Sequence, residues 1–188
     1  HGIPNALLIY CLKAVVSGAF EMKMYRFSPV HGEKQLMKAI RHVHFACHKL
    51  CKQSFSKYLP VTGNIGIFCH YPEEYSFLIK LREKMINDNP NQKYCRLHKP
   101  IAIPARKGVP KAMYTHLHIR KPDPYRHHVG DADFFLKTKA YLRLKNSLKG
   151  GKKIPGARIY GNPDLDMIEL YNPDIDALAY VCTKRIDA

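Results

Sequence analysis

Apolar residues recur at helical spacing in three segments of the chain, and each segment predicts an amphipathic helix. The first helix is expected over residues 33–57, the second over 72–87 and the third over 137–149. Their predicted buried faces consist of Leu36, Ile40, Val43, Cys47 and Leu50 in the first, Leu78, Leu81 and Met85 in the second, and Tyr141, Leu144 and Leu148 in the third. Pro72 suits a first helical turn, and Gly150 follows the third helix where a helix commonly ends.

Shorter apolar or alternating runs between these segments predict β-strands. The expected strands cover residues 64–70, 94–103, 113–120, 132–136, 167–171 and 177–183. Alternation over 113–120 predicts one strand face that carries Tyr114, His116, His118 and Arg120. The turn sequence Asn172-Pro173-Asp174 joins the last two strands and predicts a hairpin.

The order of these elements predicts a single α+β domain over residues 22–188. Its sheet is expected to be mostly antiparallel and packed against about three helices on one side. Residues 1–21 are interpreted either as an N-terminal extension or as an apolar element, and both alternatives stay open. The apolar stretch from Leu7 to Phe20 contains Lys13 and is too short to cross a bilayer, so no transmembrane segment is predicted.

Charge is distributed in blocks along the chain. Lys and Arg total 31 against 15 Asp and Glu, which gives a formal net charge of +16. Residues 34–57 carry six cations and no acid, residues 93–121 carry eight and no acid, and residues 137–158 carry eight and no acid. Residues 164–176 carry five acids and no cation. A basic face on this scale predicts a polyanionic partner. Nucleic acid comes first, an anionic membrane surface or an acidic protein follows, and the oligomeric state is left open.

The six cysteines form no CxxC pair, and several lie within apolar runs. They are therefore predicted to be small buried residues of a protein in a reducing, intracellular compartment. Histidines and cysteines also cluster in the first helix, where His44, His48 and Cys51 share one face. Zinc binding is one interpretation of this cluster, but no second Cys or His pair follows at the spacing found in zinc fingers. A partly buried helix face is the favoured interpretation.

The strand over residues 113–120 is a candidate site for chemistry. A row of aromatic, imidazole and guanidinium groups on one sheet face suits stacked bases and phosphates. His116 and His118 are also candidates for a general acid and a general base, because imidazole titrates near neutral pH. Asp131 and Asp133 fall on one face of the following strand, where paired carboxylates could bind Mg²⁺ or Mn²⁺.

The third helix and the loop after it form a candidate polyanion-binding element. Gly150 and Gly151 let the backbone approach a phosphate closely, and no acid interrupts the cations around them. The full set of predicted nucleic-acid-binding residues is Tyr114, Arg120, Lys121, Arg126, Lys137, Lys139, Arg143, Lys145, Lys149, Lys152, Lys153 and Arg158.

Three functional hypotheses follow, and no motif identifies a reaction. The first is a nucleic-acid-binding protein, with RNA or single-stranded DNA preferred over duplex because tyrosines are frequent and no helix-turn-helix is evident. The second is a metal-dependent phosphodiester enzyme that acts on nucleic acid, like a nuclease or nucleotidyltransferase. The third is a non-catalytic interaction protein that docks an acidic partner. Convergence of His116, His118, Asp131 and Asp133 in one pocket would favour the enzyme.

Overall fold

The computed structural model describes residues 25–87, 94–123, 125–162 and 165–184. The predictions for residues 1–21 lie outside these ranges. The helices are α2 (Glu33–Phe55), α3 (Pro72–Glu83) and α4 (Thr138–Lys149). The strands are β1 (Val61–Phe68), β2 (Cys95–Ile103), β3 (Ala112–Arg120), β4 (Gly130–Phe135), β5 (Ala157–Ile159), β6 (Ile168–Leu170) and β7 (Ala177–Cys182). The α+β class and all three predicted helices are confirmed.

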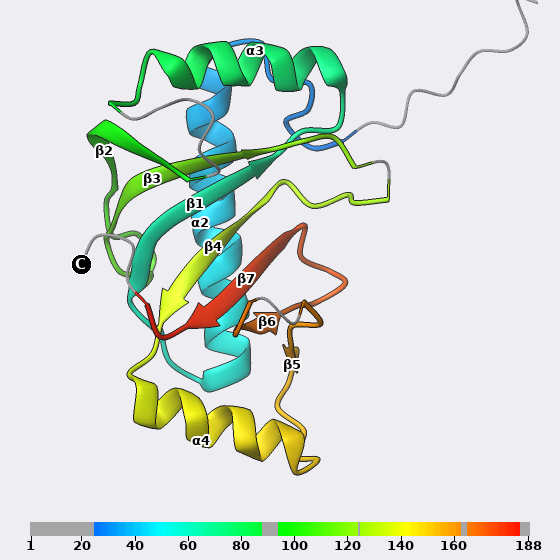
Figure 1. Cartoon of the computed structure of the whole chain (residues 1–188). Coiled ribbons are helices and arrows are strands. Elements are labelled where there is room, and N and C mark those ends of the chain that lie inside the picture. Colours follow the sequence, from blue (N-terminus) through cyan, green and yellow to red (C-terminus); the bar gives the residue numbers. More distant parts are fainter. Residues whose placement is uncertain (1–24, 88–93, 124, 163–164, 185–188) are drawn as a thin grey trace, which may run out of the picture.

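All seven strands join one sheet in the order β2-β3-β1-β4-β7-β6-β5 (Figure 1). The hairpin predicted for the last two strands is confirmed, since β6 pairs antiparallel with β7. The expectation of a mostly antiparallel sheet is wrong, because β1 pairs in parallel with β3 and β4 pairs in parallel with β7. In both cases a helix and further strand residues separate the partners along the chain, so local turn signals could not reveal the pairing.

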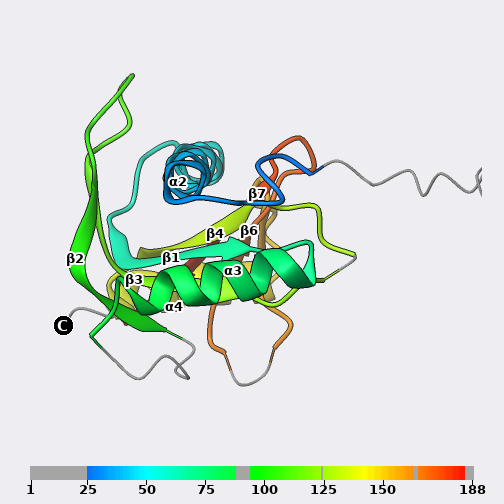
Figure 2. The same ribbon diagram turned by 90° about the horizontal axis from the view of Figure 1, so that it is seen from above.

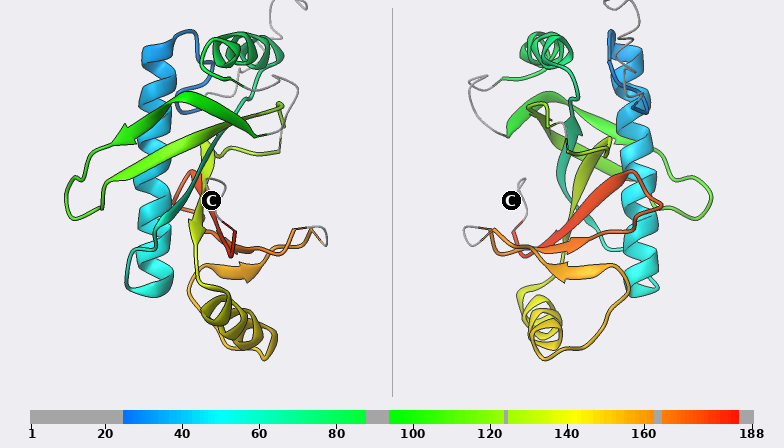
Figure 3. Two further views of the ribbon diagram at one scale, coloured as in Figure 1. Left: turned by 60° about the vertical axis from the view of Figure 1, so that its left-hand side comes forward. Right: turned by 90° about the vertical axis from the view of Figure 1, so that its right-hand side faces the viewer.

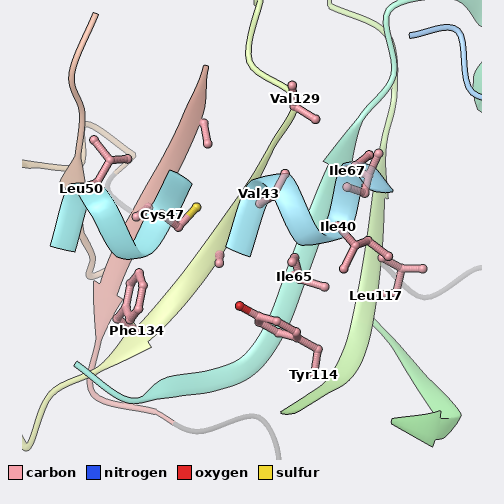
Figure 4. Packing of buried hydrophobic residues seen from close by; sticks show 14 of the residues in the cluster. Ile40, Val43, Cys47, Leu50, Ile65, Ile67, Tyr114, Leu117, Val129 and Phe134 are labelled. Carbon is pink, nitrogen blue, oxygen red and sulfur yellow. The ribbon is translucent and has the colours of Figure 1, made fainter. Parts of the chain in front are cut away.

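The helices do not all cover one side of the sheet, as the sequence suggested. Helix α2 crosses one face, whereas α3 and α4 lie at opposite ends of the sheet, and Figure 2 shows α3 on the side away from α2. The buried stripe of α2 packs on the inner residues of the central strands (Figure 4). This cluster includes Ile40, Val43, Cys47 and Leu50 from α2, and Ile65, Leu117, Ala132 and Phe134 from the strands. No helix in the described residues is long and apolar enough to span a bilayer.

The histidines and cysteines of α2 belong to this core. His44, His48, Cys47 and Cys51 are all buried. The Nδ1 atom of His44 lies 2.9 Å from the hydroxyl of Tyr114, and the Cys47 thiol donates to the carbonyl oxygen of Leu178. Burial, reinforced by the neighbouring His48, lowers the pKa of His44 to about 3. The favoured interpretation of a buried helix face therefore holds.

Candidate functional site

Three adjacent strands place His118, Gly66 and Asp131 side by side. Gly66 of β1 pairs with His118 of β3 on one side and with Asp131 of β4 on the other. A Cβ atom at Gly66 would overlap Oδ1 of Asp131, so the carboxylate occupies the space above the glycine backbone. Ala132 and Phe134, which alternate with the two aspartates along β4, pack in the core under α2. The carboxylates of Asp131 and Asp133 therefore lie on the opposite face of the sheet.

A second buried polar pair lies two residues along the same strands. The amide nitrogen Nδ2 of Asn64 donates to Oδ2 of Asp133 at 2.9 Å. Asn64 is 2% exposed, and its carbonyl oxygen Oδ1 has no hydrogen-bond partner among the described residues. An oxygen that is buried without a partner costs free energy, and such atoms occur at functional sites.

These groups line one pocket of about 510 Å³ on the face opposite α2. Its walls come from α3, from strands β1, β3, β4 and β7, and from the segments before β2 and β6. The polar and aromatic lining residues are Asn64, Tyr75, Arg82, Tyr94, His118, Arg120, Lys121, Asp131, Asp133, Tyr160 and Tyr180. The views in Figure 3 show the sheet between α2 and the side on which α3 lies. The pocket thus gathers two carboxylates, an imidazole and several cations at one place.

Tyrosine rings form much of the pocket wall. The ring of Tyr94 lies 5.3 Å from that of His118, and Tyr160 meets Tyr180 edge-on at 5.1 Å. Burial and the nearby carboxylates of Asp133 and Asp131 raise the pKa of Tyr94 to about 12. The pKa of Tyr180 is raised as well, mainly by burial and then by Asp131. Both phenols are therefore protonated at neutral pH and can donate hydrogen bonds or present a ring face.

His116 and Tyr114 do not reach the pocket. His116 is 8% exposed, its Nδ1 atom lies 3.0 Å from the hydroxyl of Thr115, and the pocket lining does not include it. Tyr114 is 0% exposed and belongs to the core with Leu117, so the predicted alternation fails at Tyr114, whereas His118 and Arg120 lie on the opposite face from Leu117 as predicted. The register between β2 and β3 shifts beside this point, which breaks the alternation. Tyr114 is therefore removed from the nucleic-acid-binding residues, since a fully buried ring cannot contact a ligand.

The other predicted cations fall into separate groups. Arg120 and Lys121 line the pocket, and Arg126 pairs with Asp123 at 3.1 Å close by. The guanidinium groups of Arg120 and Arg126 lie 4.9 Å and 6.0 Å from the Phe68 ring. The cations of α4 and its loop are not in the pocket lining. Lys152, Lys153 and Arg158 line a second, more open hollow of about 490 Å³.

Helix α4 nevertheless forms hydrogen bonds to the segment that lines one side of the pocket. Lys145 and the hydroxyl of Tyr141 both donate to Asp166 at 2.6 Å, and these two bonds lower the pKa of Asp166. The residues on either side, Leu165 and Met167, line the pocket. Lys137, Lys139, Arg143 and Lys149 remain exposed on the helix and at its start. They are a basic extension of the site rather than its centre.

The acidic segment after α4 is largely neutralised within the chain. Glu169 accepts a bond from Arg158 at 2.6 Å, and Asp176 pairs with Arg26 at 2.8 Å and with His42 at 2.6 Å. Asp166 is paired as described above. These contacts account for three of the acids that the sequence placed in one patch.

The oxygen donors suit a hard divalent cation. Among the described residues, no group of three or more His, Cys, Asp or Glu side chains converges as a metal centre. Asp131, Asp133 and the unpartnered carbonyl oxygen of Asn64 instead supply two carboxylates and one amide in one pocket. Mg²⁺ and Mn²⁺ are commonly bound by one or two carboxylates together with water and substrate oxygens.

Sequence reasoning missed several residues of the pocket. Asn64 was assigned only to the start of an apolar strand, together with Gly66 beneath the pocket, and Arg82, Tyr94 and Tyr180 were assigned to a predicted helix or strands without a functional role. The one available signal was Asn64 itself, a polar residue that directly precedes the apolar run Ile-Gly-Ile-Phe. Such a residue requires a polar partner when its strand is buried.

Comparison with known proteins supports the fold alone. No protein-family model matches the chain, and no curated protein matches it. A solved structure described as "Structural Genomics, Protein EC4020" is similar, with a TM-score of 0.51 and 13% sequence identity. The match covers 89% of this chain and 96% of that one. At this identity the likeness shows a shared architecture over most of both chains.

Proposed function

We propose that the protein is a metal-dependent phosphodiester enzyme that acts on single-stranded nucleic acid. The observation that carries the proposal is the meeting of His118 with Asp131 and Asp133 in one pocket with Arg120 and Lys121. An imidazole, paired carboxylates and cations in one pocket can together supply acid–base catalysis, cation binding and charge stabilisation for hydrolysis or transfer of a phosphodiester. The proposal thereby assigns the predicted nucleic-acid binding and the predicted catalytic chemistry to one site.

Asp131, Asp133 and Asn64 would hold the divalent cation. When bound there, Mg²⁺ or Mn²⁺ would polarise the phosphoryl group and increase the acidity of a water molecule. The absence of a side chain at Gly66 leaves room for the Asp131 carboxylate above the residue that pairs with His118. The amide of Asn64 orients Asp133 through the 2.9 Å bond to Oδ2.

His118 is the candidate general acid or base, and the cations position the phosphate. A positioned imidazole typically contributes a factor of about 10² to 10⁴ to rate. Arg120 and Lys121 follow His118 within three residues, so the end of β3 places all three groups in the same pocket. Their charge would be directed at the non-bridging phosphate oxygens.

The tyrosines favour a single-stranded substrate. Aromatic faces stack on unpaired bases, whereas the bases of a duplex present only their edges in the grooves. Tyr94 and Tyr160 are half-buried in the pocket wall, and burial of this kind holds a ring in place for stacking. The exposed cations of α4 and its loop extend the attraction along the strand.

The second candidate is a non-catalytic protein that binds single strands through the same pocket. The wall of tyrosines favours it independently of the carboxylates, because stacking needs no metal. The two candidates differ only in turnover.

An assay on labelled oligonucleotides separates them. The protein is incubated with single-stranded DNA and RNA in Mg²⁺, in Mn²⁺ and in a chelator, and products are resolved on a denaturing gel. Metal-dependent cleavage or joining supports the enzyme. Salt-sensitive binding without any product in either metal would refute the enzyme and leave the binding protein. Absence of both binding and product at low salt would overturn both proposals.

A further inference from the structure

The outward face of α2 carries a stripe of cations that the pocket does not use. The exposed residues of the stripe are Lys34, Lys38, Arg41, Lys49 and Lys52. At 100° per residue they fall within an arc of about 80°, directly opposite the apolar stripe that packs on the sheet. The only acid within α2 is Glu33, in its first turn. The stripe therefore lies on the side of the molecule opposite the pocket.

The β2–β3 hairpin adds further cations on this side. Its tip is a two-residue turn in which Arg106 and Val109 exchange backbone hydrogen bonds of 3.1 Å and 3.0 Å. Lys107 and Gly108 at the centre have φ angles of 50° and 79°, which are typical of a type I′ turn. Figures 2 and 3 show the hairpin rising past α2 on the face that α2 covers. Arg106, Lys107 and Lys111 are exposed on it.

We propose that the α2 stripe and the hairpin tip bind the phosphate backbone of a nucleic-acid duplex. The stripe from Lys34 to Lys52 extends over about 27 Å at 1.5 Å per residue, which equals about eight base pairs. The cations form two groups along this line, Lys34 to Arg41 and Lys49 to Lys52, so the stripe can contact phosphates at two places along a duplex. Two-stranded ribbons such as this hairpin also fit the major groove of B-form DNA.

The chemistry of this surface favours a duplex over a single strand. The exposed Phe and Tyr rings among the described residues are Phe77 and Tyr125, and neither lies on α2 or on the hairpin, which exposes His98 and Met113 besides its cations. Phe45, which lies within the stripe, is half-buried. Without exposed Phe or Tyr rings for stacking, the surface would bind mainly through charge, and charge without base contacts gives sequence-independent binding to the backbone. This surface is separate from the pocket, so its test does not depend on the proposed enzyme activity.

The test uses fluorescence anisotropy with a labelled 20-base-pair DNA duplex and, as a second probe, the single strand of the same sequence. The variants are Lys38→Gln/Lys49→Gln in the stripe and Arg106→Gln/Lys107→Gln at the tip. The matched control is Lys80→Gln/Lys84→Gln, which removes the same charge from exposed positions on and after α3. All four proteins are first compared by thermal unfolding.

The proposal predicts that each surface variant weakens duplex binding by about 10-fold and lowers the slope of log K against log salt by about 1.8. Single-strand binding and any strand cleavage are expected to change less than about two-fold. A duplex RNA probe is expected to respond in the same direction, since both duplexes present regular phosphates. Equal losses in the control variant would overturn the proposal, as would unchanged duplex binding in both surface variants. Lost binding to phosphatidylserine vesicles with unchanged duplex binding would assign the surface to a membrane instead.

Discussion

The carboxylate of Asp131 lies directly above the backbone of Gly66, where an added methyl group would overlap its Oδ1 atom. Gly66 lies on β1 and pairs with His118 of β3 on one side and with Asp131 of β4 on the other. It therefore separates the imidazole from the carboxylate across the sheet. A glycine in the middle of a strand costs stability, and close approach by another group is a common reason for its presence.

Gly66→Ala is therefore expected to displace the carboxylate while the fold remains. Misplacement of a catalytic group by about 1 Å can cost on the order of 100-fold in rate, and a loss of this size in metal-dependent cleavage is predicted. Gly32→Ala is the control, since a Cβ there meets nothing within 4 Å. The rates and the thermal unfolding midpoints of both variants are compared with the wild type. Full activity in Gly66→Ala would show that the position of Asp131 does not matter.

Tyr94 tests whether the pocket stacks on bases. Its ring contacts His118 at 5.3 Å and lines the pocket. Tyr94→Leu removes the ring and is expected to weaken single-strand binding by about 1–3 kcal/mol, whereas Tyr94→Phe retains the ring and most of the affinity. Binding isotherms for a short labelled oligonucleotide measure both. If Leu and Phe variants bound equally, the ring would have no stacking role.

The buried histidines predict a loss of stability in mild acid. Burial lowers the pKa of His44 to about 3 and that of His128 to about 4, and it lowers the pKa of His48 as well. The unfolded chain, in which histidine titrates near 6.5, binds more protons than the folded chain between these limits. The stability that the neutral imidazoles contribute is therefore complete above about pH 6.5 and declines as the pH falls toward 4 and 3.

The expected decline is about 1.4 kcal/mol per pH unit for each proton taken up on unfolding. Urea denaturation at pH 7.5, 6.0 and 5.0 measures it. His44→Phe is expected to flatten this dependence even though it also lowers stability at pH 7.5, because the bond to Tyr114 is lost. His31→Gln at an exposed position is the control and is expected to leave the profile unchanged. A wild-type free energy of unfolding that did not fall between pH 7.5 and 5.0 would contradict the explanation.

The fold could be predicted as far as its local patterns reach. The apolar stripe of α2 and the hairpin of β6 and β7 depend on short-range spacing, and both were predicted correctly. The parallel pairing of β1 with β3 joins residues that α3 and β2 separate along the chain. No local sequence pattern predicts such a pairing. Strict alternation failed at Tyr114, because the irregular register beside β2 turns this ring into the core against His44.

The candidate site could be predicted only in part for the same reason. His118, Asp131 and Asp133 carry reactive groups and could be named from the sequence, but their convergence depends on Gly66 and Asn64 in a strand between them. Gly66 has no chemical signature of its own, and the polar side chain of Asn64 signals only that it needs a polar partner. Tyr180 likewise enters the pocket only because β7 pairs beside β4. Residue type therefore predicts the chemistry of a site, whereas sheet order decides which residues meet.

The rate of Mn²⁺-dependent strand cleavage in aspartate variants tests the central claim most directly. Asp131→Asn and Asp133→Asn keep the side-chain size but remove the charge that would hold the cation, and Asp174→Asn at an exposed position is the matched control. The expected result is a loss on the order of 100-fold or more in both pocket variants, with unfolding midpoints and oligonucleotide binding close to those of the wild type, and no loss in Asp174→Asn. Cleavage at the wild-type rate by both pocket variants would contradict the account.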